Sequence, residues 1–139
     1  NATALEVYDR EKQATQIRTA EQLARTHVLF FLFRGDCPYC QQFAPLLKSF
    51  EQKFGLPVFA ISLDGGTLPE FPRARVDNGI AATLNATQVP ALFLASPRTN
   101  VITPLGYGVL SETELLERLQ AIATPAGNAA AHCRYCSAA

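Results

Sequence analysis

A cysteine pair at the junction of a strand and a helix constrains this chain more than any other feature. The tetrapeptide Cys37-Pro38-Tyr39-Cys40 follows the apolar run 28–33, which predicts a fully buried strand. Apolar residues at helical spacing predict a helix over residues 41–54. The N–H groups and the dipole at the start of a helix stabilise a thiolate. A C-x-x-C in such a β-α-β context is the usual mark of a thiol–disulfide redox site.

Composition narrows the class of protein. The 139 residues predict one domain with tails at either end, and 48% apolar residues suffice for a sizeable core. The formal net charge is zero, which argues against binding to nucleic acid or to a membrane surface. No apolar run approaches the roughly 18–20 residues of a membrane span.

The start of the chain bears on its origin. It begins at Asn1 and contains no methionine, so we expect it to be part of a longer reading frame. Removal of an export signal and simple trimming of the chain explain this equally well.

Glycine, proline and capping residues divide the sequence into alternating predicted helices and strands. Residues 3–26 are polar and helix-prone, and predict one or two helices, the second packing on the sheet. The other expected elements are strands at 28–33, 58–63, 91–95 and 101–105, helices at 41–54 and 79–84, a surface loop at 67–78, and a last helix opened by the capping box Ser111-Glu112-Thr113-Glu114. The triplet Gly106-Tyr107-Gly108 is expected to break the last strand.

This pattern divides the chain into three parts. We expect an N-terminal helical extension at residues 1–16, a folded domain at 17–123, and a flexible tail at 124–139. The tail contains a second C-x-x-C pair, Cys133 and Cys136.

The order of elements resembles the thioredoxin fold over roughly residues 17–123. Besides the cysteine pair, the residues that match are Val89-Pro90 before the third strand and Gly108-Val109-Leu110-Ser111 before the last helix. The resemblance implies an α/β protein with a central mixed four-stranded sheet flanked by helices.

A closer resemblance is to the TraF/TrbB family of conjugative-transfer proteins, which are exported thioredoxin-like proteins of type IV secretion systems. The matching segments are Phe33 to Cys40, Ser62-Leu63-Asp64-Gly65-Gly66, Val89 to Leu94 and Gly106-Tyr107-Gly108. The resemblance implies that members keeping the cysteine pair are periplasmic disulfide isomerases or oxidoreductases. Members that have lost the pair are implied to be assembly components. This chain keeps both cysteines.

The cysteine motif suggests a role for each of its residues. By its position at the helix start, Cys37 is expected to be the attacking thiol, and Cys40, one turn further in, the buried resolving thiol. Pro38 suits the first helical turn, and Tyr39 can present an aromatic face beside the site. The resemblance implies a cis Val89-Pro90 bond, with Val89 and Pro90 holding the substrate strand.

Two departures from thioredoxins affect the chemistry. Where thioredoxins have a buried aspartate six residues before the first cysteine, this chain has Phe31, so the usual proton acceptor for Cys40 is missing. Where they have a tryptophan, it has Asp36, whose carboxylate opposes a thiolate at Cys37 unless Arg34 offsets it. Both changes argue against a dedicated thioredoxin-type reductase.

Other interpretations stay open for several motifs. The Cys37/Cys40 pair could be a structural disulfide or half of a zinc site completed by the tail. His132, Cys133 and Cys136 could ligate metal, form a second redox pair or belong to a disordered tail. The loop that begins at Asp64-Gly65-Gly66 could contribute to substrate choice or be a solvated connection.

We therefore expect a monomeric thiol–disulfide oxidoreductase of the bacterial periplasm, and most specifically a disulfide isomerase for exported conjugation proteins. Its partners would be proteins with disulfides or thiols and a redox partner in the envelope; no metal or cofactor beyond the cysteines is expected. Within the same class, the rival is a dithiol oxidase or reductase. Outside it, the rivals are a non-catalytic assembly component of the transfer apparatus and a zinc module.

Overall fold

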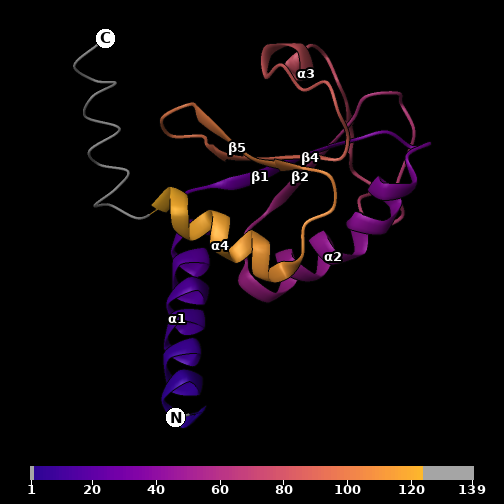
Figure 1. Cartoon of the computed structure of the whole chain (residues 1–139). Helices are drawn as coiled ribbons and strands as arrows, with labels where there is room; N and C mark the ends of the chain where they lie inside the picture. Colours follow the sequence, from indigo (N-terminus) through magenta and orange to yellow (C-terminus); the bar gives the residue numbers. More distant parts are fainter. Residues whose placement is uncertain (1, 124–139) are drawn as a thin grey trace.

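The computed structural model describes residues 2–123, which form nine helices and strands (Figure 1). In chain order these are α1 (Ala2–Leu23), β1 (Val28–Phe33), α2 (Pro38–Phe54), β2 (Val58–Ser62), β3 (Arg75–Val76), α3 (Ile80–Thr83), β4 (Ala91–Ser96), β5 (Val101–Tyr107) and α4 (Glu112–Ala123). The predicted order of helices and strands is confirmed, apart from the addition of β3. None of these helices is long and apolar enough to cross a membrane.

The strands form one mixed sheet in the order β3-β2-β1-β4-β5. Strand β1 lies parallel to β2 and antiparallel to β4, while β2 and β3 are parallel and β4 and β5 antiparallel. The predicted α/β class is confirmed, but the sheet has five strands rather than four. Arg75 and Val76, in the segment expected to be a surface loop, pair with Ile61 and Ser62.

Strand β5 is longer than the sequence predicts. It continues through Gly106 to Tyr107, where a break was expected. A register shift between Leu92 and Phe93 absorbs the irregularity, since these two residues pair with Gly106 and Pro104. The shift leaves Leu105 without a partner residue in β4, and a bulge of this kind bends the strand locally.

The two faces of the sheet are covered unequally. Helices α2 and α4 lie on one face, and the short α3 lies on the other (Figure 1). Alternate residues of β1 point to opposite faces: Phe31 and Phe33 join the core beneath α2 and α4, while Leu32 joins a smaller cluster on the α3 side. The larger core therefore supports the helix that follows the cysteine motif.

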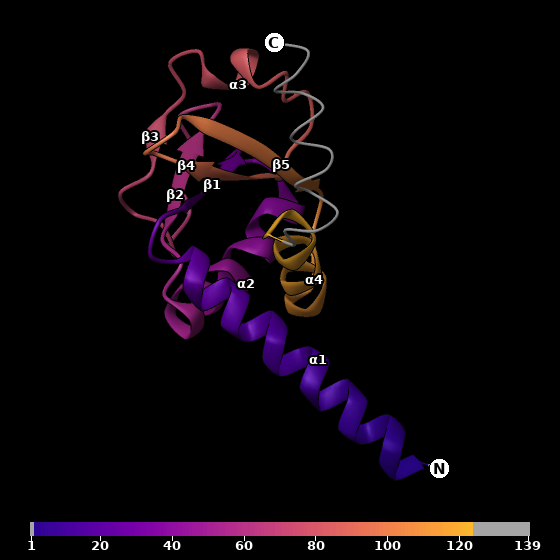
Figure 2. The ribbon, with the colours of Figure 1, turned by 90° about the vertical axis from the view of Figure 1, so that its left-hand side faces the viewer.

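Residues 2–23 form a single helix, α1, where one or two were expected. Gln16 and Ala20, in its C-terminal half, are buried, and α1 runs beside α4 there. Its N-terminal half extends away from the rest of the protein (Figure 2), and Leu5 and Tyr8 are exposed there. The expected division between residues 16 and 17 falls inside this helix and remains a prediction.

Candidate active site

Cys37 is the N-cap of α2. Its backbone is extended (φ −98°, ψ 111°), and its Sγ accepts a hydrogen bond from the backbone N–H of Cys40 at 3.1 Å. Pro38 begins the helix, where its missing N–H leaves no donor unpaired. Because the free N–H groups and the dipole at a helix start favour negative charge, this position suits a thiolate. The sulfur thus lies where the sequence predicts the attacking thiol.

Cys40 differs from Cys37 in its surroundings. Cys40 is fully buried, whereas Cys37 is partly exposed, and both are free thiols. Burial raises the pKa of Cys40 to about 12, with a further contribution from its hydrogen bond to Cys37 and only partial relief from the Arg34 backbone. At neutral pH Cys40 is therefore a protonated thiol, and its sulfur is less accessible than that of Cys37.

Arg34 lies beside Asp36, where its positive charge can offset the carboxylate. Its Nε donates to Oδ1 of Asp36 at 3.0 Å and its Nη2 donates to Oδ2 at 3.3 Å. The Asp36 carboxylate raises the pKa of Arg34 through this hydrogen bond and through its charge. The pair is exposed and contributes little to stability, but it keeps a positive charge next to Asp36, one residue before Cys37.

Asp64 ties the loop after β2 to the turn that precedes Cys37. Its carboxylate accepts hydrogen bonds from the backbone N–H groups of Gly35 and Gly66, each at 2.9 Å. These two amides, with Gly35 the larger influence, lower the pKa of Asp64. The turn is fixed from its other side by Gln41, whose Nε2 donates to the Gly35 carbonyl at 3.0 Å.

The two loops touch through their backbones. A Cβ atom at Gly35 would lie 2.6 Å from the Cα of Gly66, which is closer than side-chain atoms approach in proteins. The contact therefore requires glycine on both loops, and the Asp64 hydrogen bonds hold it closed. We call this loop contact, with its Asp64 hydrogen bonds, the Asp64 clamp. It was not predicted, because Gly35 and Asp64 are 29 residues apart. The signal in the sequence was a glycine in each of two loops that follow adjacent parallel strands.

The Val89-Pro90 peptide bond is cis, as the resemblance implied. Pro90 is buried, and its carbonyl accepts a hydrogen bond from the N–H of Gly108 at 2.8 Å. Because Leu32 of β1 pairs with Ala91 of β4, the end of β1 and the start of β4 lie at the same edge of the sheet. The cysteine motif at the start of α2 and the loop with Val89-Pro90 thus lie at the same edge, with Tyr39 largely exposed beside the cysteines. The substrate-holding roles of Tyr39, Val89 and Pro90 remain predictions.

Phe31 fills the place where thioredoxins keep a buried aspartate. Its ring is fully buried and packs on those of Phe33, Phe43 and Phe71, with centroid separations of 5.5, 5.8 and 5.7 Å. This aromatic cluster puts hydrocarbon in the core below the cysteine helix and supplies no proton acceptor.

The remaining candidate residues lie outside the part of the chain that the structure describes. They are His132, Cys133 and Cys136, so the zinc and second-pair interpretations stay predictions. Between residues 2 and 123, no three His, Cys, Asp or Glu side chains gather as a metal site.

The arrangement of helices and strands is a thioredoxin-like fold. Among solved structures, the chain is similar to Trichomonas vaginalis thioredoxin, with a TM-score of 0.52, 20% identity, and coverage of 79% of this chain and 89% of that one. It is also similar to the N-terminal domain of PilB from Neisseria gonorrhoeae, with a TM-score of 0.53, 19% identity, and coverage of 73% and 78%.

The chain belongs to the TraF family, described as the F plasmid transfer operon protein, whose family model matches residues 1–120. It is 33% identical over 106 residues to protein TraF of Escherichia coli, covering 76% of this chain and 43% of that protein. It is also 33% identical over 104 residues to protein TrbB of the same organism, covering 72% and 57%. The chain thus spans about half the length of these relatives.

Proposed function

We propose that this chain is a thiol–disulfide oxidoreductase, and specifically a disulfide isomerase. The observation that most supports this is the asymmetry of the pair. Cys37 caps α2 with a partly exposed sulfur, while Cys40 is buried and its pKa is about 12. Cys37 is thus arranged to react with a substrate first, and Cys40 to react only afterwards.

In the first step, the Cys37 thiolate attacks one sulfur of a substrate disulfide. The substrate S–S bond breaks, a mixed disulfide between Cys37 and the substrate forms, and the other substrate sulfur leaves as a thiolate that takes up a proton from solvent. No net oxidation has occurred at this stage. The number of disulfides is unchanged, because one S–S bond within the substrate has been replaced by one S–S bond between the substrate and Cys37.

The second step decides between isomerase and reductase. If another substrate thiolate attacks the mixed disulfide, Cys37 is released as a thiolate and the substrate keeps a rearranged disulfide. If Cys40 attacks Cys37 instead, the substrate leaves reduced and the protein pair is oxidised by two electrons. The second route requires Cys40 to lose its proton, and burial opposes this. The absence of a carboxylate at Phe31 favours the first route further.

The substrates we propose are exported proteins of conjugative transfer, handled in the periplasm and followed by recycling through an envelope redox partner. Membership of the TraF family supports the link to transfer. Val89-Pro90 and Tyr39, at the edge that holds the cysteines, are proposed to hold the substrate strand beside Cys37. The protein is proposed to act as a monomer, with its cysteines as the only redox cofactor.

The test combines a reduction potential, measured by equilibration with glutathione, with reactivation of scrambled ribonuclease. We expect a potential more oxidising than the value of about −270 mV for thioredoxin, together with reactivation. Cys37→Ser should abolish reactivation, whereas Cys40→Ser should retain part of it and accumulate a mixed disulfide. The matched control is Cys133→Ser/Cys136→Ser, which should behave as the wild type.

Two outcomes would overturn the proposal. A Cys37/Cys40 pair that does not exchange with glutathione would leave the assembly component as the better interpretation. Reactivation that survives Cys37→Ser but is lost in the tail variant would move the active pair to Cys133 and Cys136.

A further inference from the structure

A second surface lies along the side of the sheet, on the outer edge of β2. Strand β3 has only two residues and pairs with Ile61 and Ser62. Among residues 2–123, the first three residues of β2, Val58 to Ala60, therefore have no strand partner on that side. The Val58 N–H donates instead to Oε2 of Glu51 at 2.8 Å. A strand edge of this kind is a template for another extended segment.

A groove of about 710 Å³ follows this edge, between β2, the middle of α2 and the segment 70–76. Cavities of roughly 300–1,000 Å³ are typical of ligand sites. The apolar part of its lining includes Phe59, which is 55% exposed, and Val76, which is 66% exposed. The ring of Phe59 is 6.3 Å from that of Phe30, so the groove has an aromatic wall.

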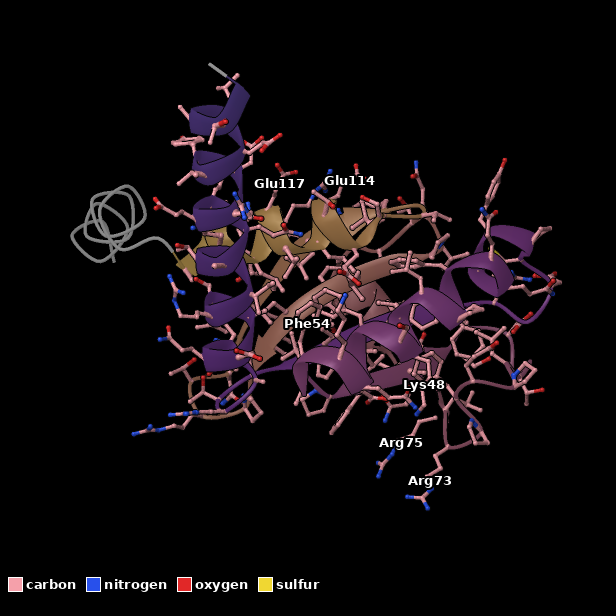
Figure 3. All side chains as sticks on the ribbon, turned by 90° about the horizontal axis from the view of Figure 1, so that it is seen from below. Lys48, Phe54, Arg73, Arg75, Glu114 and Glu117 are labelled. Atoms are coloured by element: carbon pink, nitrogen blue, oxygen red, sulfur yellow. The ribbon has the colours of Figure 1, made fainter. Side chains whose placement is uncertain are left out.

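The charges of the groove are unbalanced. Lys48 donates to Glu51 at 3.0 Å, and these two charges offset each other. Arg73 and Arg75 are exposed and have no ion pair with any residue between 2 and 123, while one further carboxylate, Glu70, lies in the lining. Figure 3 shows Lys48, Arg73 and Arg75 on one side of the protein, with Glu114 and Glu117 on the other.

We propose that this groove binds an extended acidic segment of a partner protein, added alongside the outer edge of β2. Its apolar side chains would pack on Phe59, and its carboxylates would pair with Arg73 and Arg75. Unpaired guanidinium groups beside an apolar strip favour alternating acidic and apolar residues. The groove begins at the N-terminal end of β2, whereas the cysteines follow the C-terminal end of the neighbouring β1. The proposal does not depend on the redox activity.

The probe is a displayed library of random heptapeptides, selected on the intact chain with dithiothreitol present to exclude mixed disulfides. We expect the enriched peptides to combine acidic and apolar residues. Binding of a synthetic enriched peptide, measured by fluorescence anisotropy, should weaken about tenfold or more in Arg73→Glu/Arg75→Glu. The matched control Arg25→Glu/Arg98→Glu makes the same change of charge at exposed positions elsewhere and should bind as the wild type does.

The test remains decisive if the charge reversal prevents folding, as judged by circular dichroism. Arg73→Gln/Arg75→Gln then takes its place and should remove most of the salt dependence of binding. A failure to enrich acidic peptides, or equal binding by the groove variant and the wild type, overturns the proposal. Self-association that the groove variant abolishes, without binding of any peptide, identifies a second copy of the chain as the occupant and also overturns it.

Discussion

The two faces of the sheet differ in how completely their aromatic side chains are buried. On the face beneath α2 and α4, Phe31 and Phe43 are fully buried and pack edge to face. On the other face, Phe59 is 55% exposed beside the short helix α3. The first face packs the cysteine helix against the sheet. The second leaves Phe59 exposed at the outer edge of β2, where it lines the groove proposed for a partner.

Phe43→Ala should have the largest effect, because it opens a cavity in the well-packed face. We expect the free energy of unfolding to fall by about 3–5 kcal/mol in urea denaturation. Phe59→Ala is the matched control, since it removes the same ring from the opposite face. A loss of less than about 2 kcal/mol for Phe43→Ala would mean that the face beneath α2 is not the main source of stability.

Asp64→Asn should have an intermediate effect, at the edge where the two loops meet. Hydrogen bonds from Gly35 and Gly66 hold the pKa of Asp64 below its ordinary value of 3.8. The folded state therefore binds the proton less readily than the unfolded state, and Asp64 contributes stability above that value that is lost as the pH falls below it.

Urea denaturation of the wild type should accordingly lose stability more steeply than the Asp64→Asn variant as the pH falls from about 5 to about 3. At neutral pH the variant should also show altered alkylation of Cys37, because the turn before it is released. The substitution keeps the shape of the side chain and so isolates its charge. Parallel pH profiles would rule out a stabilising role for the carboxylate.

Phe59→Ala should have the smallest effect on folding and a clear effect on binding. Because Phe59 is already 55% exposed, we expect a loss of less than about 1 kcal/mol in unfolding free energy. Binding of the selected acidic peptides should weaken severalfold, as measured by anisotropy. Unchanged binding together with unchanged stability would indicate that the ring serves neither purpose.

Local patterns were sufficient to predict most of the fold. The apolar run 28–33 and the capping box at Ser111 both form the elements expected, with Ser111 N donating to Glu114 at 3.0 Å and Glu114 N donating to the Ser111 hydroxyl at 3.1 Å. The cis Val89-Pro90 bond depended on the family resemblance, since an isolated X–Pro is seldom cis.

What escaped prediction depends on contacts between distant residues. Arg75 and Val76 are both exposed, so they show no alternation, and only the pairing with β2 makes them a strand. The Asp64 clamp joins residues 29 positions apart, and an Asp-Gly-Gly sequence predicts only a turn. The groove beside β2 arises because β3 begins only at Arg75, opposite Ile61, and leaves Val58 to Ala60 beside the groove, which the sequence does not indicate.

The hydrogen bond from Cys40 N to the Cys37 sulfur couples redox state to helix stability. A thiolate is a far stronger acceptor than a disulfide sulfur, so α2 is best capped when Cys37 is reduced and ionised. Oxidation replaces the favourable end group of the helix with a neutral one. The first turn of α2 thereby favours the reduced pair over the disulfide, and reduced is the state that the proposed isomerase activity requires.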